Sequence, residues 1–388
     1  EKIYFVTGGG TGGHIYPAVS VINTLIEDGP DAKNIYYLGN KKNLEYEIAQ
    51  KNGYNFLTYS AKGMPRKIGF HFIAWLFGLF LATLKAFTYV MKYRPSVVFA
   101  TGGYVCAPIL FCASILRIPY VLHDCDMQPG IVTRFFARGA KSVSLAFDGA
   151  KKYINSKDIQ VNGNPIRQEF RTISKKQARD EISIKEDEFV ILIMGGSLGA
   201  RTINNASFKI LKEYANKSGV QIIWQTGKKN FDDITKKILE EMSVLPDNLV
   251  LQPYIDKMHL ALLSSDLVIS RAGSLSLSEI CACSLPSILI PYPYAAADHQ
   301  KKNALNFVEY KVSVMLEDKD CNNETLFELT DSLMKNKELL SELSFNAYKM
   351  AKLNGAELIV KQIKQAIILK FIFKFFIYKY FVDLFYIN

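Results

Sequence analysis

Short apolar runs alternate with helical patterns of polar and apolar residues along the first half of the chain. Runs of about four to seven residues rich in Val, Ile, Tyr and Phe are typical of buried strands. We predict such strands near residues 3–7, 34–39, 54–60, 96–101, 119–123 and 140–145. The pattern begins again at Phe189–Met194, and Leu267–Ser270 predicts a further strand. Repeated strand–helix units build parallel sheets with helices on both faces, so the chain is predicted to be α/β.

The length of the chain indicates two domains. It has 388 residues, whereas a single hydrophobic core rarely grows beyond roughly 250–300 residues. A turn-rich segment, Val161–Arg167, is followed by a charged stretch that ends at Glu188, which is typical of a connection between domains. We therefore assign residues 1–165 to a first Rossmann-like domain, residues 166–365 to a second one, and residues 366–388 to a tail.

Glycine-rich turns follow three of the predicted strands. They are Gly8–Gly13, Thr101–Tyr104 and Gly195–Ala200. Glycine lets the backbone approach a ligand closely, and the free N–H groups at a helix start favour an anion, so a phosphate is the expected ligand. The first turn contains a G-x-G-x-x-G pattern, which by itself is shared by many dinucleotide-binding folds.

His14 follows the first glycine turn at the predicted start of a helix. An imidazole at this place lies above the strand ends, where α/β sheets bind their ligands, and it can exchange a proton near neutral pH. His14 is therefore a candidate general base. The alternative is that its side chain only caps the helix or packs against the loop.

The second domain has its own group of polar residues after predicted strands. The segment Arg271–Glu279 turns from a strand into a helix that carries a carboxylate, and a later loop ends in Asp298–Ala304. Glu279 could accept hydrogen bonds from the two adjacent hydroxyls of a ribose, and the small residues before it leave room for a base. The alternative is that the carboxylate only interacts with the positive end of the helix dipole.

Two apolar segments indicate contact with a membrane. Ile73–Leu84 is bounded by basic residues and is shorter than the roughly 20 residues that a helix needs to span a bilayer. We predict a helix that packs on the sheet and exposes an apolar patch to a membrane surface, with a buried crossover helix as the alternative and a true span as the less favoured one. The tail from Ala366 to Asn388 mixes aromatic rings with three lysines, which suits an interfacial anchor. An extension without a catalytic part is the alternative for this tail.

The charge and the cysteine content indicate which kinds of partner the protein binds and in which cell compartment it lies. The formal net charge is +10, and the excess falls in residues 1–165 and in the tail, so lipid headgroups or nucleic acid are the expected anionic partners. The six cysteines form no C-x-x-C pair and no zinc spacing, which predicts reduced thiols in a cytosolic protein. The first residues lack the pattern of a secretory signal. A peripheral protein on the cytoplasmic face of the membrane is therefore expected.

Six ordered motifs together resemble one family. They are GGGTGGHIYPA near the start, TGGYVCAP at 101–108, GNPIR at 163–167, GGSLGA at 195–200, SRAGSLSLSE at 270–279 and DHQKKNA at 298–304. In these motifs the chain resembles the MurG family of glycosyltransferases in bacterial wall synthesis. The resemblance implies the GT-B fold, in which two Rossmann-like domains with parallel sheets face each other across a cleft.

The resemblance also implies a reaction. The enzyme would transfer N-acetylglucosamine with inversion from UDP-GlcNAc to the 4-hydroxyl of the MurNAc of lipid I, which gives lipid II and UDP. Its partners would be UDP-GlcNAc, lipid I, the anionic membrane surface and further wall-synthesis proteins, and no nucleic acid. His14 would be the general base toward the acceptor, and Asp126 would be a second catalytic residue. The acceptor would be bound by Gly10, Gly102, Gly103 and Tyr104.

The donor residues follow from the same resemblance. Glu279 would hold the ribose, Ile255 would lie against the uracil, and Ser197 with Arg167 would meet the phosphates. The residues assigned to the donor are Thr11, Gly12, Gly13, Arg167, Ser197, Ile255, Ser274, Leu275, Ser276, Glu279, His299 and Gln300.

The chain departs from the family at one position. The family commonly has H-E-Q-N where this chain has His123-Asp124-Cys125-Asp126. Asp126 replaces an amide, which both donates and accepts, by a carboxylate that only accepts once ionised. It would either bind a sugar hydroxyl or act as a second base beside His14. A D-x-D metal site is a third interpretation; the two Rossmann-like halves argue against it, so we expect no metal and no cofactor besides the co-substrate.

Rival functions are not excluded by the short glycine motifs. A GT-B enzyme could glycosylate diacylglycerol or another polyprenol acceptor. An NAD-dependent oxidoreductase would need an acidic residue at the end of the second strand, but Asn40 follows that strand. A nucleic-acid binder is less well supported, because the positive charge lies with the apolar helix and not with aromatics along a groove.

Overall fold

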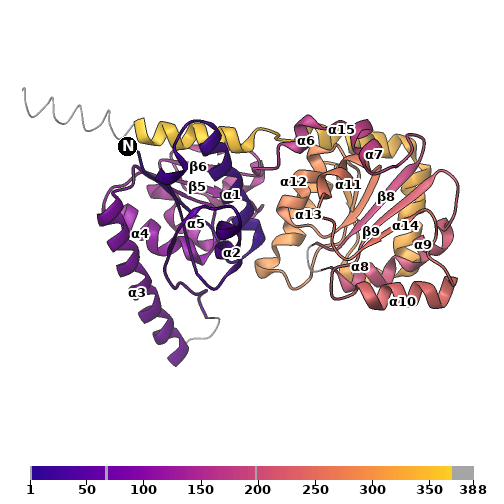
Figure 1. The fold of residues 1–388 in the computed structure, drawn as a ribbon, viewed down its shortest axis with the longest axis horizontal. Coiled ribbons are helices and arrows are strands. Elements are labelled where there is room, and N and C mark those ends of the chain that lie inside the picture. Colours follow the sequence, from indigo (N-terminus) through magenta and orange to yellow (C-terminus); the bar gives the residue numbers. More distant parts are fainter. Residues whose placement is uncertain (1, 66–68, 197–198, 369–388) are drawn as a thin grey trace, which may run out of the picture. The chain divides into compact units, whose positions relative to one another are not determined.

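The computed structural model describes residues 2–65, 69–196 and 199–368, which divide into two compact units (Figure 1). The first unit contains the chain up to Pro165 and the residues from Asn354 onward, and the second contains Ile166–Leu353. The boundary after Pro165 lies where the turn-rich segment predicted it. Two parts of the predictions, Ser197 and the basic residues at 66–67, lie outside the described residues. The predicted tail anchor lies outside them from residue 369 onward.

The first unit is built on a seven-stranded parallel sheet. Its strand order is β3-β2-β1-β4-β5-β6-β7. All six predicted strands are present, and the short edge strand β7 was not predicted, because it has only three residues and is half-buried. The bounds are β1 Tyr4–Thr7, β2 Ile35–Gly39, β3 Asn55–Thr58, β4 Val97–Ala100, β5 Tyr120–Asp124, β6 Ser142–Leu145 and β7 Ile159–Val161.

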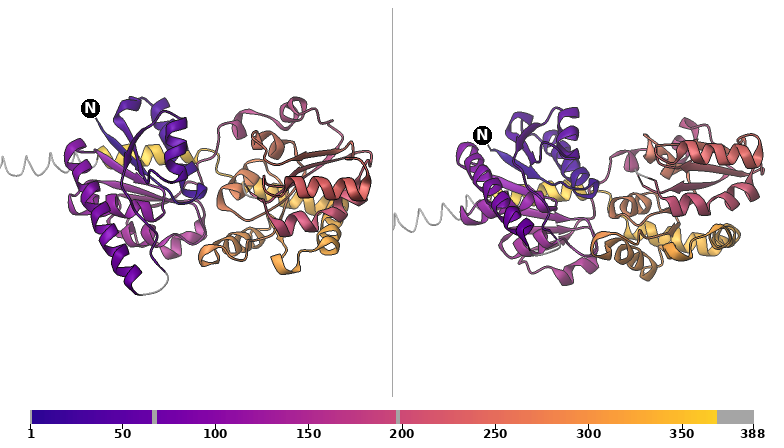
Figure 2. Two further views of the ribbon diagram at one scale, coloured as in Figure 1. Left: turned by 60° about the horizontal axis from the view of Figure 1, so that its bottom comes forward. Right: turned by 90° about the horizontal axis from the view of Figure 1, so that it is seen from below.

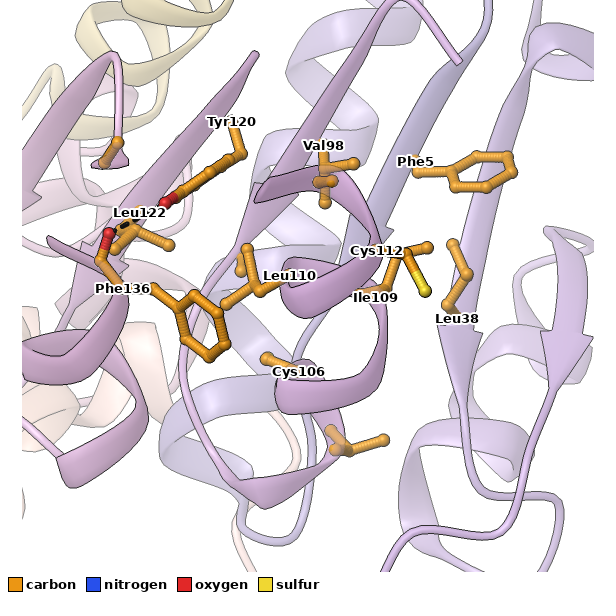
Figure 3. Close-up of a cluster of buried hydrophobic side chains, with 14 of the residues drawn as sticks. Phe5, Leu38, Val98, Cys106, Ile109, Leu110, Cys112, Tyr120, Leu122 and Phe136 are labelled. Atoms are coloured by element: carbon orange, nitrogen blue, oxygen red, sulfur yellow. Dashed lines mark hydrogen bonds between the residues drawn. The ribbon is translucent and has the colours of Figure 1, made fainter. Parts of the chain in front are cut away.

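Helices cover both faces of this sheet. They are α1 Gly12–Glu27, α2 Leu44–Lys51, α3 Phe70–Tyr93, α4 Ala107–Ile115 and α5 Ile131–Phe136, with 3-10 turns η1 Ala32–Asn34, η2 Tyr104–Cys106, η3 Ala137–Gly139 and η4 Asp148–Tyr153. On one face the buried side chains of Phe5, Leu38, Ile109, Leu110 and Phe136 pack together (Figure 3). Burial of each such side chain contributes roughly 1.5–3 kcal/mol, so this layer is a main source of the unit's stability.

Helix α3 packs on the first unit by one narrow face. Only Ala82, Ala86 and Val90 of its 24 residues are fully buried, and Phe77 and Phe80 are 62% and 57% exposed. Figures 1 and 2 show the helix on the outside of the unit. The exposed apolar face that the sequence predicted is therefore present. The helix is longer than the predicted run; by length and composition alone it could also cross a membrane.

The C-terminal helix, residues 355–368, packs on the opposite face of the first sheet (yellow in Figure 1). Ile359, Val360 and Ile363 are buried against side chains of β1, β2 and α1. This corrects our assignment of residues 354–365 to the second domain. The apolar spacing of this helix was visible in the sequence, but which sheet it covers depends on a return of the chain that no local pattern encodes.

The second unit repeats the design with a six-stranded parallel sheet of order β10-β9-β8-β11-β12-β13. Its strands are β8 Phe189–Met194, β9 Val220–Gln225, β10 Leu249–Gln252, β11 Leu267–Ser270, β12 Ser287–Leu289 and β13 Ser313–Met315. Its helices are α6 Glu169–Thr172, α7 Lys175–Glu181, α8 Arg201–Ala206, α9 Phe208–Tyr214, α10 Phe231–Met242, α11 Met258–Ser264, α12 Ser274–Ala282, α13 His299–Glu309, α14 Asn323–Lys335 and α15 Lys337–Met350, with η5 Ala296–Asp298 and η6 Asp318–Asp320.

Both sheets reverse their strand order at one point. The chain steps outward from β1 to β2 and β3, then returns to place β4 on the other side of β1; β8 and β11 stand in the same relation in the second unit. In open α/β sheets, ligands bind at the carboxyl ends of the strands at this point. The glycine turns after β1, β4 and β8 and the segment after β11 all begin there.

Candidate active site

The first two glycine loops pack directly on each other. A Cβ atom on Gly8 would lie 1.8 Å from Thr101 Oγ1, and one on Gly103 would lie 2.2 Å from the carbonyl oxygen of Gly9. No side chain fits at such distances, so glycine is required for this contact. The structure therefore brings together the two turns that the sequence predicted as separate phosphate-binding loops.

The start of α1 presents unpaired N–H groups beside these loops. Thr11 is the N-cap residue, but its side chain makes no capping hydrogen bond, and the first turn contains no acidic residue. The first N–H groups of a helix have no partner within the helix, so those of Gly12 and Gly13 suit an anion. Thr11, Gly12 and Gly13 lie in the first unit, whereas all other predicted donor residues lie in the second.

The imidazole of His14 lies against the second glycine loop. A Cβ atom on Gly102 would be 3.0 Å from Nδ1, and one on Gly103 would be 3.3 Å from Cδ2. Both glycines have positive φ, +97° and +84°. The carbonyl oxygen of His14 accepts a hydrogen bond of 2.6 Å from Thr101 Oγ1. Gly102 and Gly103 thus form a seat against which the ring packs.

The loop after β5 lies close to His14 and is shaped by Asp124. The carboxylate of Asp124 is buried; Oδ2 accepts a hydrogen bond from the N–H of Gly130 at 3.0 Å and Oδ1 accepts one from the N–H of Asp126 at 3.3 Å. Burial raises the pKa of Asp124, whereas the hydroxyl of Thr133 and the imidazole of His14 act to lower it. Asp124 is therefore the acceptor that holds this loop.

Asp126 is half-buried in the same loop, next to the buried Cys125. Potential ligand atoms of Asp124, Cys125 and Asp126 lie within 4.8 Å of one another, which is the geometric basis of the D-x-D interpretation. Both carboxylate oxygens of Asp124 already accept backbone hydrogen bonds. This makes Asp124 a loop-holding residue, whereas Asp126 Oδ2 lies 3.8 Å from the thiol of Cys125.

A series of hydrogen bonds between buried side chains holds this loop in place. His123 Nε2 lies 3.0 Å from Asn164 Oδ1, and Asn164 Nδ2 donates to the carbonyl oxygen of Cys125 at 3.3 Å. On its other side, His123 Nδ1 lies 3.1 Å from Ser144 Oγ. Burial lowers the pKa of His123 to about 4, so the ring is neutral at physiological pH, and the contact with Asn164 places its proton on Nε2. Neither His123 nor Asn164 was predicted from the sequence to support this loop.

The chain of hydrogen bonds continues to the C-terminal helix. Asn162 Nδ2 donates to Ser144 Oγ at 3.1 Å and to Gln362 Oε1 at 2.7 Å, and Gln362 also hydrogen-bonds to Ser142. A Cβ atom on Gly355 would lie 2.9 Å from the carbonyl oxygen of Asn164, so glycine is needed where this helix begins. The last described helix is therefore part of the support of the first site.

In the second unit, the third glycine loop is joined to the segment that holds Ile255. Gln225, at the end of β9, donates from Nε2 to the carbonyl oxygen of Gly196 at 3.0 Å. Its Oε1 accepts a hydrogen bond of 2.9 Å from the N–H of Ile255. Gln225 was not predicted from the sequence, although its position at a strand end next to the glycine loop was an available signal. Ser197, predicted to meet the phosphates, lies outside the described residues.

Glu279 and Arg167 come together in the second unit although they are far apart in the sequence. Glu279 lies on α12 and is mostly removed from water. Burial raises its pKa to about 7, and the positive charge of Arg167 acts in the opposite direction. Arg167 itself is exposed. A carboxyl group that is poorly solvated and close to one cation is well suited to accept hydrogen bonds from a ligand.

The other predicted donor residues occupy two helix starts. Ser274 is buried at the first position of α12, and Leu275 and Ser276 follow it half-buried. His299 opens α13. Gln300 Oε1 accepts a hydrogen bond of 3.0 Å from the N–H of Tyr292, so this amide braces the loop before α13.

Arg271 braces the same loop from β11. It donates to the carbonyl oxygens of Ile290 and Pro291 at 3.0 and 3.2 Å and pairs with Asp318 at 2.5 Å. The positive charge of Arg271 is therefore neutralised within the protein by Asp318. Arg271 opened a predicted motif, and the structure shows that it holds the loop.

Two family models match the chain. The glycosyltransferase family 28 N-terminal domain matches residues 4–145, and the C-terminal domain of that family matches residues 190–363. The crystal structure of Acinetobacter baumannii MurG has a TM-score of 0.75 and 25% identity, and the similarity covers 94% of this chain and all of that one. A UDP-N-acetylglucosamine--N-acetylmuramyl-(pentapeptide) pyrophosphoryl-undecaprenol N-acetylglucosamine transferase from Carboxydothermus hydrogenoformans is 34% identical over 351 residues, 90% of this chain and 93% of that protein. This chain belongs to the MurG family.

Other similarities agree with MurG membership. A protein of the same description from Caldanaerobacter subterraneus subsp. tengcongensis is 34% identical over 362 residues, 93% of this chain and 99% of that protein. The UDP-GlcNAc 2-epimerase of Neisseria meningitidis shares the fold, with a TM-score of 0.65 at 14% identity. The predicted GT-B class is confirmed, with a parallel sheet in each of the two MurG units.

Proposed function

We propose that this chain transfers N-acetylglucosamine from UDP-GlcNAc to the 4-hydroxyl of the MurNAc in pentapeptide pyrophosphoryl-undecaprenol, forming lipid II and UDP. Relatives of that description are 32–34% identical over at least 90% of the chain. The main support for this proposal in this chain is the position of the His14 ring against Gly102 and Gly103. An imidazole fixed at a helix start, between two glycine loops that suit a pyrophosphate, is placed for proton transfer to and from a phosphorylated sugar.

The acceptor side of the reaction uses the first unit. His14 removes the proton from the 4-hydroxyl as the oxygen attacks C1 of N-acetylglucosamine. The new bond forms on the face of C1 opposite the bond to UDP, so the configuration inverts as that bond breaks and its electron pair leaves with UDP. Free N–H groups at the start of α1 and in the glycine loops hold the pyrophosphate of the acceptor.

The donor side uses the second unit. Glu279 accepts hydrogen bonds from the ribose hydroxyls, and Ile255 lies against the uracil. Arg167 and the N–H groups at the start of α12, where Gly273 is the N-cap residue, offset the negative charge that grows on the departing UDP. His299 and Gln300 complete the donor site at the start of α13.

This scheme routes no step through a metal ion. Arg167 and the helix starts supply the positive charge that a cation supplies in other transferases. Turnover should therefore be unchanged within twofold when EDTA is added to metal-free buffer. Loss of turnover with EDTA and its recovery with manganese would instead support the D-x-D site at Asp124 and Asp126.

The apolar face of α3 supports a peripheral position on the cytoplasmic side of the membrane. Phe70, Ile73, Phe77 and Phe80 are exposed along one helix. An apolar face beside basic residues binds anionic lipid surfaces by burial and charge together. Substitution of Phe77 and Phe80 by Ser should release the protein from anionic vesicles while leaving turnover of a water-soluble acceptor unchanged; unaltered vesicle binding would contradict this position.

The reaction is tested with a lipid I analogue and radiolabelled UDP-GlcNAc. His14→Ala should lower kcat by about 100-fold to 10,000-fold, the usual contribution of a general base, and should leave UDP affinity unchanged. Asp126→Asn, which restores the family's amide, should keep turnover within about tenfold of the starting protein if Asp126 binds a sugar hydroxyl. A loss as large as that of His14→Ala would identify Asp126 as a base.

The rival acceptor is tested in the same assay. Diacylglycerol and a simple polyprenyl phosphate replace the lipid I analogue, and we expect labelled product only with lipid I. Labelled product from diacylglycerol alone would refute the proposal while leaving the donor site intact.

A further inference from the structure

The turns that follow β2 and β3 are clasped to each other by one side chain. Asn40 Nδ2 donates to the carbonyl oxygen of Ala61 at 2.8 Å, and Asn40 Oδ1 accepts from the N–H of Ala61 at 2.8 Å. Such a reciprocal pair fixes both position and orientation. Both turns leave the carboxyl edge of the first sheet, the edge that carries the glycine loops and His14.

A buried carboxyl group holds the first of these turns. Glu45 is fully buried, and its Oε1 accepts hydrogen bonds of 3.2 Å from the N–H of Asn40 and from Asn43 Nδ2. Cβ atoms on Gly9 and Gly39 would lie within 2.9 Å of the Glu45 side chain, so glycine makes room for it under the first loop. Among the described residues Oε2 has no partner. Burying a carboxyl oxygen without a partner costs free energy. The protein therefore holds this turn in place at a cost to its stability.

The clasped turns also fix Tyr104. Asn43 Nδ2 donates to the hydroxyl of Tyr104 at 3.3 Å. The Tyr104 ring lies against Gly10, where an added Cβ would be 3.1 Å from Cε1, and against Gly63, where it would be 3.6 Å from Cδ1. The turn after β2, the segment after β3 and the two glycine loops therefore form one rigid surface around Tyr104.

This surface carries three lysines. Lys41 and Lys42 lie between the two asparagines of the first turn, Lys62 follows Ala61 directly, and all three are exposed. Lys62 is further tied to the apolar helix α3, since its carbonyl oxygen accepts a hydrogen bond of 2.9 Å from Trp75 Nε1. Within residues 2–65, 69–196 and 199–368, no carboxylate forms an ion pair with any of the three, whereas Lys33 nearby in the sequence pairs with Asp31.

We propose that Lys41, Lys42 and Lys62 form an anion subsite for the acceptor, next to Tyr104. The subsite rests on the proposed function and deepens it. Its ligand is an anionic oxygen group of the acceptor, supplied by either a carboxylate of the pentapeptide or the pyrophosphate. Because the turns are fixed before binding, little conformational freedom is lost when the anion binds, which is the advantage of a preorganised site.

The test uses the full chain and a lipid I analogue with a short, water-soluble chain in place of undecaprenol. In the double variant Lys41→Ala/Lys42→Ala, and separately in Lys62→Ala, the KM for the acceptor should rise about 1.5-fold to fivefold per charge pair lost at low salt, the range expected for exposed charge pairs. The kcat and the KM for UDP-GlcNAc should not change. The rise should shrink at high salt because salt screens exposed charges. Lys51→Ala, an exposed lysine at the far end of α2, is the matched control and should behave as the starting protein.

Two further acceptors distinguish the sources of the anion. If peptide carboxylates bind, an acceptor with amidated carboxylates removes the difference between the lysine variants and the starting protein. If the pyrophosphate binds, the difference persists with an acceptor that lacks the peptide. Either result supports the subsite.

Other results overturn it. Unchanged acceptor KM in all lysine variants, with an active starting protein, refutes the subsite and leaves the proposed function standing. Unchanged KM together with weaker binding to anionic vesicles would assign the lysines to the membrane instead. If the starting protein itself does not turn over the acceptor but does bind UDP-GlcNAc, the proposed function fails first.

Discussion

The raised pKa of Glu279 predicts that donor binding depends on pH in a range where the donor itself does not titrate. Burial moves the pKa of this carboxyl from 4.5 to about 7, against the opposing charge of Arg167. In the proposed donor site the ribose hydroxyls donate to Glu279, so they bind the ionised carboxylate more strongly than the protonated one. The phosphates of UDP-GlcNAc are already ionised above pH 5, and the uracil stays neutral below pH 8.

The magnitude follows from the ionised fraction. With a pKa of about 7, roughly 90% of the carboxyl is ionised at pH 8 and roughly 10% at pH 6, since one pH unit changes the ratio of the two forms tenfold. The Kd for UDP-GlcNAc should therefore rise about tenfold between pH 8 and pH 6. At pH 7, binding should release about half a proton, because donor hydrogen bonds favour the charged form.

Isothermal titration calorimetry measures both quantities. Kd is determined from pH 6 to pH 8, and buffers of different ionisation enthalpy report the released proton. Glu279→Gln should bind more weakly, by roughly 10-fold to 100-fold at pH 8 for the loss of charged hydrogen bonds, and should lose the pH dependence. His299→Gln serves as the control and should keep it. A Kd that is constant from pH 6 to pH 8 in the starting protein, or an equal slope in Glu279→Gln, would show that Glu279 does not control donor binding.

Three further predictions concern the support of the two sites. If His14 is the general base, Gly102→Ala should lower kcat at least tenfold, because the new Cβ would press on the His14 imidazole, whereas Gly29→Ala, which has a similar positive φ and open space around it, should keep full activity in the same assay. Gln362→Leu should lower the thermal unfolding midpoint, because Asn162 and Ser142 each lose a buried hydrogen bond, at a cost of about 1–3 kcal/mol each. Lys361→Leu, at the exposed neighbouring position, should leave the midpoint unchanged. Equal midpoints for the two variants would contradict a stabilising role for the buried hydrogen bonds of Gln362. Glu279→Gln should be more stable than the starting protein at pH 8, by up to about 3 kcal/mol, but not at pH 4. The reason is that the folded pKa of Glu279 is raised to about 7, so the starting protein loses stability as the pH rises above the unfolded pKa of 4.5. Thermal unfolding midpoints of both proteins, measured from pH 4 to pH 8, test this prediction.

Periodicity and turn chemistry predicted six of the seven strands of the first sheet, whereas β9, β10 and β13 of the second sheet were not predicted. The six strands of the first half were predicted because each is a short, continuous apolar run, as expected for parallel strands buried on both faces. Strand β7 was missed because three half-buried residues give no such run. The C-terminal helix was assigned to the wrong unit, since its apolar face fits either sheet and only the return of the chain decides which one it covers.

The candidate residues divide in the same way. His14 and the glycine loops were visible because their chemistry depends on a local order of strand, turn and helix. The contact of Gly102 with the imidazole, the support of His123 by Asn164 and the clasp between Asn40 and Ala61 join residues from separate strands. No spacing along the chain encodes these contacts, so sequence reasoning did not find them.

The local chemistry follows from the order of residues along the chain: where glycine opens a loop, which apolar runs form strands, and which carboxylates and imidazoles stand at strand ends. The environment of those groups depends instead on how the chain folds. The pKa of Glu279 depends on how much water the folded unit removes from it and on the nearby charge of Arg167, and the position of the His14 ring depends on a loop almost 90 residues away in the chain. Burial, distance and packing are properties of chain segments brought together in space, which is why they appear only with the fold.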